Sequence, residues 1–166
     1  MRIARFAVAG GDPRFGIVEL EADEGQFPDT IAVIDGDPLA GPVNYTGERI
    51  ALDDARLLAP VIPRSKVVCV GMNYAEHRAE LGHEGNDAPL LFLKPNTTII
   101  GPGDAIQIPP VEGRIVHEGE LAIVSGSIAK RVKAEDWRDV VFGFTIANDV
   151  SARDQMFADG QWARAK

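Results

Sequence analysis

Turn residues interrupt this sequence at short intervals, which limits the length of any regular element that it can form. The chain has 17 glycines and 11 prolines among its 166 residues. Short alternating runs lie between the turns, for example residues 3–8 and 15–20 on either side of the turn at 10–13. Such runs bounded by turn residues are typical of strands in hairpins. The sequence therefore predicts a mainly β (α+β) architecture with short helices, not a doubly wound α/β sheet.

The composition of the chain changes after a proline-rich stretch at residues 59–63. We expect a small N-terminal accessory β domain over residues 1–62 and a second domain over 63–166. The second domain should contain strands at 66–70, 90–93, 118–124 and 141–147, with short helices at 74–81 and 134–140. Ionisable residues with the spacing of a reactive site occur only in this second part, so the functional site is predicted there.

Charge and cysteine content narrow the possible partners and the compartment. The net charge of −8 would repel phosphate backbones, so a nucleic-acid partner is not expected. The single cysteine, Cys69, cannot form an internal disulfide, and its apolar neighbours predict a buried strand residue, not a nucleophile. No apolar run reaches the length of a membrane span, and the N-terminus lacks a signal-peptide pattern. These features predict a cytoplasmic globular protein with no membrane partner.

Three acidic residues have a spacing that suits a cation site. Glu118 and Glu120 are two apart in a predicted strand, so both side chains point to the same face. Asp149 follows a second apolar strand and could reach the same place. Three carboxylates could complete one face of an octahedral cation, and oxygen ligands favour Mg²⁺ or Mn²⁺, with Ca²⁺ possible. The alternatives are a solvated acidic strand face and, for Asp149, a turn or helix-capping residue.

Two further groups could move protons or hold negative charge. His77 and Glu80 are three residues apart, so they are neighbours if this segment is helical. A carboxylate beside an imidazole fixes its tautomer and raises its basicity, which suits a general base; a surface charge pair is the alternative. Lys166 could hold an oxyanion or carboxylate as a point charge, although a lysine at the last position of a sequence is usually frayed.

Six short motifs, in this order, resemble the fumarylacetoacetate hydrolase family. The resemblance covers about residues 67–166, and residues 1–60 resemble, less specifically, the small N-terminal domain of bacterial members. The motifs are Val-Gly-Met-Asn-Tyr at 70–74, Leu-Phe-Leu-Lys-Pro-Asn at 91–96, Ile-Gly-Pro-Gly-Asp at 100–104, Glu-Gly-Glu-Leu-Ala at 118–122, Asn-Asp-Val-Ser-Ala-Arg-Asp at 148–154 and Gly-Gln-Trp at 160–162.

The resemblance implies a mostly β catalytic fold, usually in a homodimer, and an enzyme that acts on small 2-oxo or 1,3-diketo acids through a metal-stabilised enolate. Hydrolysis of a C–C bond, isomerisation and decarboxylation all remain open. It implies roles for eight residues: metal binding by Glu118, Glu120 and Asp149, a general-base dyad of His77 and Glu80, charge stabilisation by Lys166, and substrate binding by Arg153 and Lys94.

The sequence departs from the family pattern in two places. The family usually has glutamine two residues after the aspartate of Ala-Arg-Asp; here Met156 holds that position and Gln155 precedes it. Family members also continue beyond the lysine that Lys166 matches, so we expect the strands that close the catalytic core to be missing, with unpaired edges and exposed apolar surface. The alternative function is therefore an inactive truncated fragment that retains only metal or partner binding.

Overall fold

The computed structural model describes residues 1–20, 28–85 and 87–166, which divide into two compact units. The first unit comprises Met1–Ile62, Ile99–Ala105 and Ile123–Phe144, and the second comprises Pro63–Thr98, Ile106–Ala122 and Thr145–Lys166. The predicted division into domains at residue 62 stays a prediction. Every residue for which the sequence suggested a role in chemistry lies in the second unit.

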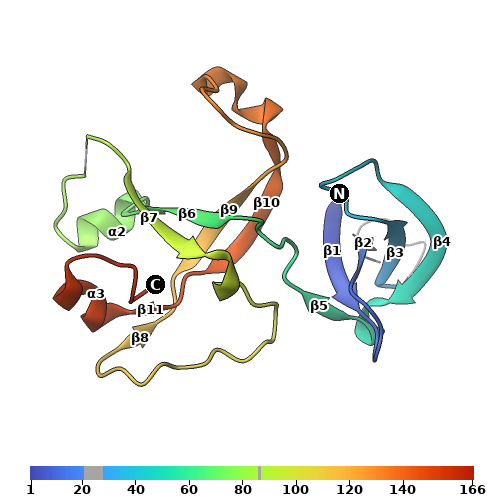
Figure 1. The fold of residues 1–166 in the computed structure, drawn as a ribbon, viewed down its shortest axis with the longest axis horizontal. Helices are drawn as coiled ribbons and strands as arrows, with labels where there is room; N and C mark the ends of the chain where they lie inside the picture. Colours follow the sequence, from blue (N-terminus) through green and yellow to red (C-terminus); the bar gives the residue numbers. More distant parts are fainter. Residues whose placement is uncertain (21–27, 86) are drawn as a thin grey trace. The chain divides into compact units, whose positions relative to one another are not determined.

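The first unit contains a five-stranded antiparallel sheet of order β4-β3-β2-β1-β5 (Figure 1). Its elements are β1 (Arg2–Ala7), β2 (Arg14–Glu19), β3 (Thr30–Asp35), β4 (Asn44–Ala51), the 3₁₀ helix η1 (Leu52–Asp54) and β5 (Arg56–Leu58). The hairpin expected from the alternating runs is confirmed, since Ile3 of β1 pairs with Ile17 of β2. One side of this sheet forms a core of Ala4, Phe6, Ile31 and Val33.

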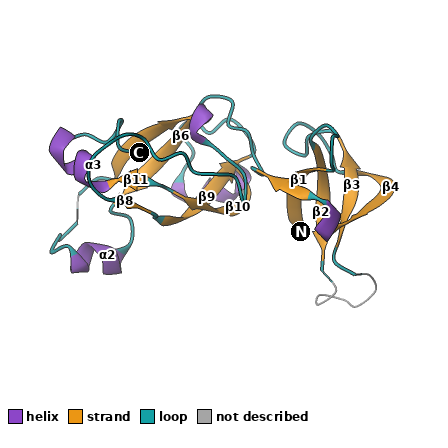
Figure 2. Ribbon diagram, turned by 90° about the horizontal axis from the view of Figure 1, so that it is seen from below, coloured by secondary structure: helices purple, strands orange, loops and turns teal. Residues whose placement is uncertain are grey.

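The later strands form three two-stranded sheets, β6 with β7, β8 with β11, and β9 with β10 (Figure 1; Figure 2 gives the view from below). Their bounds are β6 (Lys66–Gly71), β7 (Leu90–Pro95), β8 (Ile115–Val116), β9 (Gly119–Ser125), β10 (Val141–Asn148) and β11 (Ser151–Ala152). The helices are α2 (Ala75–Glu80), α3 (Arg153–Asp159), and the 3₁₀ helices η2 (Asn96–Thr98) and η3 (Ala134–Asp139). The predicted mainly β fold with short helices is confirmed.

Two local predictions need adjustment. The segment at 134–140 forms the 3₁₀ helix η3 instead of an α-helix, and the strand predicted from Glu118 begins one residue later, at Gly119. Glu118 still shares a face with Glu120, because both are partly buried while Gly119 between them is exposed. The alternation that predicted a shared face therefore extends one residue beyond the strand.

The antiparallel pair β6–β7 has two different faces. Its outer face carries exposed apolar side chains, among them Val68 opposite Leu93 and Val70 opposite Leu91. Its other face carries the partly buried Cys69, Phe92 and Lys94. This second face supports the carboxylate site.

None of the helices over 1–20, 28–85 and 87–166 has the length and apolarity that a membrane crossing requires.

Candidate metal centre

The three predicted carboxylates come together. One oxygen each from Glu118, Glu120 and Asp149 can be chosen so that all three lie within 4.8 Å of one another. Backbone pairing explains their proximity: the N–H of Asp149 donates to the carbonyl of Glu118 at 2.8 Å, and the Asn148 side-chain oxygen accepts from the Glu118 N–H at 3.1 Å. The start of β9 and the end of β10 are thus fixed side by side, with their acidic side chains adjacent.

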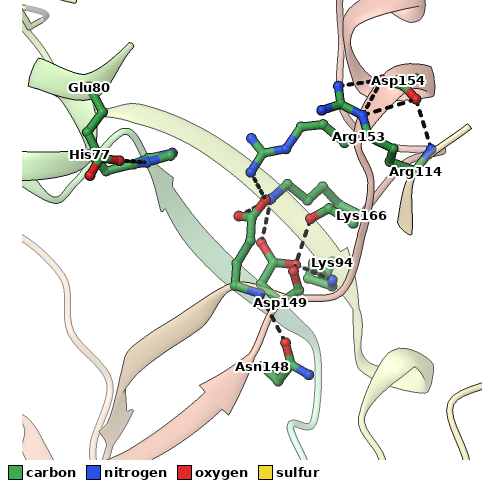
Figure 3. A network of polar contacts seen from close by, with 11 residues as sticks. His77, Glu80, Lys94, Arg114, Asn148, Asp149, Arg153, Asp154 and Lys166 are labelled. Carbon is green, nitrogen blue, oxygen red and sulfur yellow. Dashed lines mark hydrogen bonds and ion pairs between the residues drawn. The ribbon is translucent and has the colours of Figure 1, made fainter. Parts of the chain in front are cut away.

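Cationic side chains pair with two of these carboxylates, Glu118 and Asp149, and Figure 3 shows Lys94, Arg153 and Lys166 gathered near Asp149. Lys166 Nζ lies 2.6 Å from Glu118 Oε2 and 2.9 Å from Asp149 Oδ2, and Lys94 donates to the other oxygen of Asp149. Arg153 lies 3.3 Å from Glu118 Oε1. Two of the carboxylates therefore take these ion pairs, and with Glu120 included the formal charges of the three carboxylates and the three cationic groups cancel. The side chains of Lys166 and Asp149 are only 3% and 8% exposed, so these contacts are weakly screened by solvent.

An aromatic pair borders Lys166. The rings of Phe92 and Trp162 meet edge to face, with their centroids 5.1 Å apart. Lys166 Nζ lies 5.2 Å from the Phe92 centroid and 5.7 Å from that of Trp162, within cation–π range. Gly71 of β6 leaves room for this arrangement, because a Cβ there would lie 2.7 Å from Cη2 of Trp162. These aromatic rings therefore limit the positions that the ammonium group can take.

The segment that ends at Lys166 is held in place, whereas a lysine at the last position of a sequence is usually frayed. The preceding residue, Ala165, is buried with Ala152 and Met156 in a small core. Its carbonyl accepts the N–H of Ala152 at 2.8 Å, and its own N–H donates to the carbonyl of Trp162 at 3.0 Å. This short segment is thereby fixed against β11 and the start of α3, which places the lysine side chain over the carboxylates.

Met156 and Gln155 occupy different environments. Met156, at the position where the family usually has glutamine, is 5% exposed and packs in the small core with Ala152 and Ala165. The side-chain oxygen of Gln155 is buried and has no hydrogen-bond partner among the described residues. At the position where the family usually has glutamine, this chain therefore has an apolar side chain, Met156, that packs in a core. The side-chain amide of the neighbouring Gln155 keeps an oxygen without a hydrogen-bond partner among the described residues.

Burial has electrostatic consequences at two residues of the site. Desolvation raises the pKa of Glu120 above its usual range; Asp149 and Glu118 add to the rise, while a hydrogen bond from Tyr74 and the charge of Lys166 oppose it. Burial also raises the pKa of the Cys69 thiol, with Asp149 contributing in the same direction. Cys69 is half-buried on the strand face beside the carboxylates, and its raised pKa disfavours the thiolate that a nucleophile needs.

The predicted His77–Glu80 pair forms on α2. His77 Nδ1 lies 3.5 Å from Glu80 Oε2, and both side chains are exposed, at 44% and 75%. Figure 3 shows the pair apart from Asp149 and the side chains around it. No hydrogen bond or ion pair joins the two groups within the described ranges. The helix thus brings the imidazole and carboxylate together without placing them in direct contact with Glu118, Glu120 or Asp149.

Sequence reasoning assigned no role to four residues that organise this site. Tyr74 bonds to β9, Asn148 holds the Glu118 backbone, and Phe92 and Trp162 border Lys166. Tyr74 directly precedes the predicted helix of His77 and Glu80, and Asn148 directly precedes Asp149, so each has a weak local signal. Trp162 is only four residues from Lys166, but Phe92 is 74 residues away, so no local pattern could connect the ring pair with the lysine.

The fold and the site together define a class: a mainly β protein with a cluster of three carboxylates able to hold a divalent cation. Residues 66–166 match the family model described as fumarylacetoacetate (FAA) hydrolase C-terminal, and residues 1–60 match one described as Rv2993c-like, N-terminal. The chain belongs to the fumarylacetoacetate hydrolase family.

Three similar proteins illustrate the relationship. Protein Rv2993c of Mycobacterium tuberculosis is 45% identical over 166 residues, which is 100% of this chain and 61% of that protein. Oxaloacetate tautomerase Fahd2a, mitochondrial, of Rattus norvegicus is 44% identical over 66% of this chain and 35% of its own length. The crystal structure of 5-carboxymethyl-2-hydroxymuconate delta-isomerase from Mycobacterium smegmatis has a TM-score of 0.84 and 43% identity, covering 100% of this chain and 61% of that one.

The chain therefore spans less than two thirds of the length of each of these relatives. The activities in the relatives' names belong to longer proteins. The family and the mainly β fold are established for this chain.

Proposed function

We propose that this chain carries the metal-binding site of an enzyme that converts small 2-oxo or 1,3-diketo acids through an enolate. The observation that carries the proposal is the meeting of three carboxylate oxygens within 4.8 Å, in a site where Asp149 is 8% exposed. Carboxylates this close repel one another unless positive charge lies between them. A solvated acidic strand face would instead leave all three carboxylates in open water.

The residues present fit a divalent cation. Their donors are all carboxylate oxygens, which Mg²⁺, Mn²⁺ and Ca²⁺ prefer. Glu118 Oε1 is buried and accepts no hydrogen bond from the described residues, although Arg153 forms an ion pair with it at 3.3 Å, so this oxygen keeps the capacity to bind a cation. A divalent cation bound by Glu118, Glu120 and Asp149 would supply positive charge that stabilises an enolate oxygen.

The cationic side chains fit an anionic substrate. Because Lys94, Arg153 and Lys166 already balance the three carboxylates, a bound divalent cation would leave the site with excess positive charge. An acid of the proposed class would be attracted by that charge. Lys166 can donate an N–H to oxygen on which negative charge develops, and Arg153 can hold a carboxylate in two parallel hydrogen bonds.

His77 and Glu80 on α2 supply a proton acceptor. Glu80 lies beside Nδ1 of His77, which leaves Nε2 free to take a proton. For hydrolysis, His77 would take a proton from water that attacks the distal carbonyl. For isomerisation, it would move a proton between carbon or oxygen atoms of the substrate. Decarboxylation uses the same enolate stabilisation and requires no attacking water.

Isomerisation is the reaction that the similar proteins favour among these three. The names of two relatives specify a tautomerase and an isomerase, and both names describe the movement of a proton. Oxaloacetate is therefore the first substrate to test, with its keto–enol conversion followed by ultraviolet absorbance. Hydrolysis and decarboxylation would instead be detected as cleavage products or carbon dioxide.

The direct test is a thermal shift with Mn²⁺ or Mg²⁺, with and without oxalate, which resembles a pyruvate enolate. Ligand at about a hundred times its dissociation constant stabilises a folded protein by about 2.7 kcal/mol. We expect oxalate to raise the melting temperature only when the metal is present. Glu118→Ala should abolish both this shift and metal-dependent turnover, while Glu112→Ala, which removes an exposed carboxylate outside the cluster, should retain them.

Two results would contradict the proposal. Unchanged turnover in Glu118→Ala would refute the metal assignment. A clean transition without a metal or oxalate shift would favour the alternative, a non-catalytic chain. Size-exclusion chromatography of the same samples tests the homodimer that we propose for the active form, since a monodisperse dimer supports a functional unit and soluble aggregate supports an incomplete one.

A further inference from the structure

Tyr74 lies where two parts of the proposed site meet. It precedes α2, the helix that carries His77 and Glu80, and its carbonyl accepts the N–H of Arg78 at 3.1 Å in the first turn of that helix. Its hydroxyl accepts the N–H of Leu121 in β9 at 3.0 Å. One residue therefore joins the helix of the proposed proton acceptor to the strand that carries Glu120.

The same hydroxyl influences the side chain of Glu120, the residue that precedes Leu121, because its polar contact opposes the rise in the pKa of that carboxyl. A phenolic hydroxyl has one donor and can accept as well, so while it receives the Leu121 N–H its own O–H is available to the carboxylate. The geometry thus fixes the hydroxyl at the backbone of β9 next to Glu120, where it can guide the orientation of that carboxylate.

The backbone before Tyr74 is held in an uncommon conformation. Met72 has φ of 54°, in the left-handed region that non-glycine residues rarely adopt. Its carbonyl accepts a hydrogen bond from Arg78 Nη1 at 3.2 Å, which ties the turn to α2. Gly71, immediately before, is packed against Trp162 and has no space for a side chain. The connection from β6 to α2 is thus specified over several residues, and it delivers the Tyr74 ring to β9.

We propose that Tyr74 is a positioning residue that orients the Glu120 carboxylate for cation binding and fixes α2 to β9. The inference rests on the proposed function, since it assumes that Glu120 binds a metal ion. Hydrogen-bond partners of metal ligands are a recognised determinant of affinity, and their removal typically weakens metal binding about 10-fold to 100-fold. A residue that served only to dock the helix would change stability and leave metal affinity unaltered.

The experiment compares the wild-type chain with Tyr74→Phe and with Tyr45→Phe, which removes the hydroxyl of the other tyrosine, an exposed residue of β4. Phenylalanine keeps the ring, so the variant loses only the hydroxyl, which accepts the Leu121 N–H and influences Glu120. Mn²⁺ affinity is measured from the electron paramagnetic resonance signal of free Mn²⁺. Exchange of the Leu121 amide hydrogen is measured by NMR, and near-ultraviolet circular dichroism checks the fold.

For Tyr74→Phe we expect a Mn²⁺ dissociation constant raised about 10-fold to 100-fold and faster exchange of the Leu121 amide, with Tyr45→Phe equal to wild type in both. Wild-type Mn²⁺ affinity in a folded Tyr74→Phe variant overturns the inference and leaves the proposed function intact. Unchanged exchange at Leu121 overturns the link between α2 and β9. A wild-type chain that does not bind Mn²⁺ removes the proposed function itself and the inference with it.

Discussion

The β1–β5 sheet and the strands around the carboxylates bury opposite kinds of side chain. In the sheet, Phe6 and Ile31 are 0% exposed and form an apolar core. Around the carboxylates, the most enclosed side chains include the charged Asp149 and Lys166. Leu121 and Ile146, on β9 and β10, are 62% and 86% exposed. Apolar burial therefore organises the first region, whereas hydrogen bonds and ion pairs organise the second.

This difference shows that similar strand patterns can serve different purposes. In β1 and β3 the apolar residues meet one another across a sheet face and exclude water. In β6, β7, β9 and β10, many apolar residues face away from the site, and no described residue covers them well enough to bury them. The polar side chains on the opposite face are fixed by their partners. The first region should thus lose most stability when apolar volume is removed.

The largest expected effect tests this contrast directly. Phe6→Ala should destabilise the chain by about 3–5 kcal/mol, because it leaves a cavity in a closed core. Leu91→Ala, on an exposed strand face, should change the unfolding free energy by no more than about 0.5 kcal/mol. Urea unfolding followed by far-ultraviolet circular dichroism measures both. Equal losses in the two variants would contradict the contrast between the regions.

A medium effect should appear where packing is tight in the second region. Gly71→Ala would place a methyl group against Trp162 and should cost about 1–3 kcal/mol. Gly143→Ala in β10 is the matched control, since an added Cβ there meets nothing within 4 Å. In a Trp162→Leu background, Gly71→Ala should cost less, because the obstructing ring is gone. Thermal unfolding of the four variants measures this coupling, and additive losses would argue against it.

The smallest effect concerns an exposed ion pair in the first turn of α3. Hydrogen bonds from the Arg114 guanidinium lower the pKa of Asp154 below its ordinary value of 3.8. The stabilisation is therefore present above pH 3.8 and is lost as the pH falls through the lower pKa of the folded state. Asp154→Asn should melt at a slightly lower temperature than wild type at pH 7, and the difference should shrink toward pH 3. A difference that grew on acidification would have the wrong sign.

The relation between sequence and structure also differs between the two regions. The hairpin of β1 and β2 was predictable because alternation and turns act over a few residues. The shared face of Glu118 and Glu120 and the neighbouring positions of His77 and Glu80 followed from the same local rules. The boundaries of β9 and the 3₁₀ form of η3 did not, since the ends of short elements depend on contacts that the local pattern does not contain.

The sequence by itself determined the mainly β class, the family and the set of carboxylates, because strand periodicity and ordered motifs are properties of the linear chain. Only the tertiary structure decided that Asp149 meets Glu118, that Lys166 is enclosed beside Phe92 and Trp162, and that Tyr74 reaches β9. These contacts join residues between 4 and 74 positions apart. Most of them depend on strand pairing and chain packing, which act through space and leave no periodic signal in the sequence.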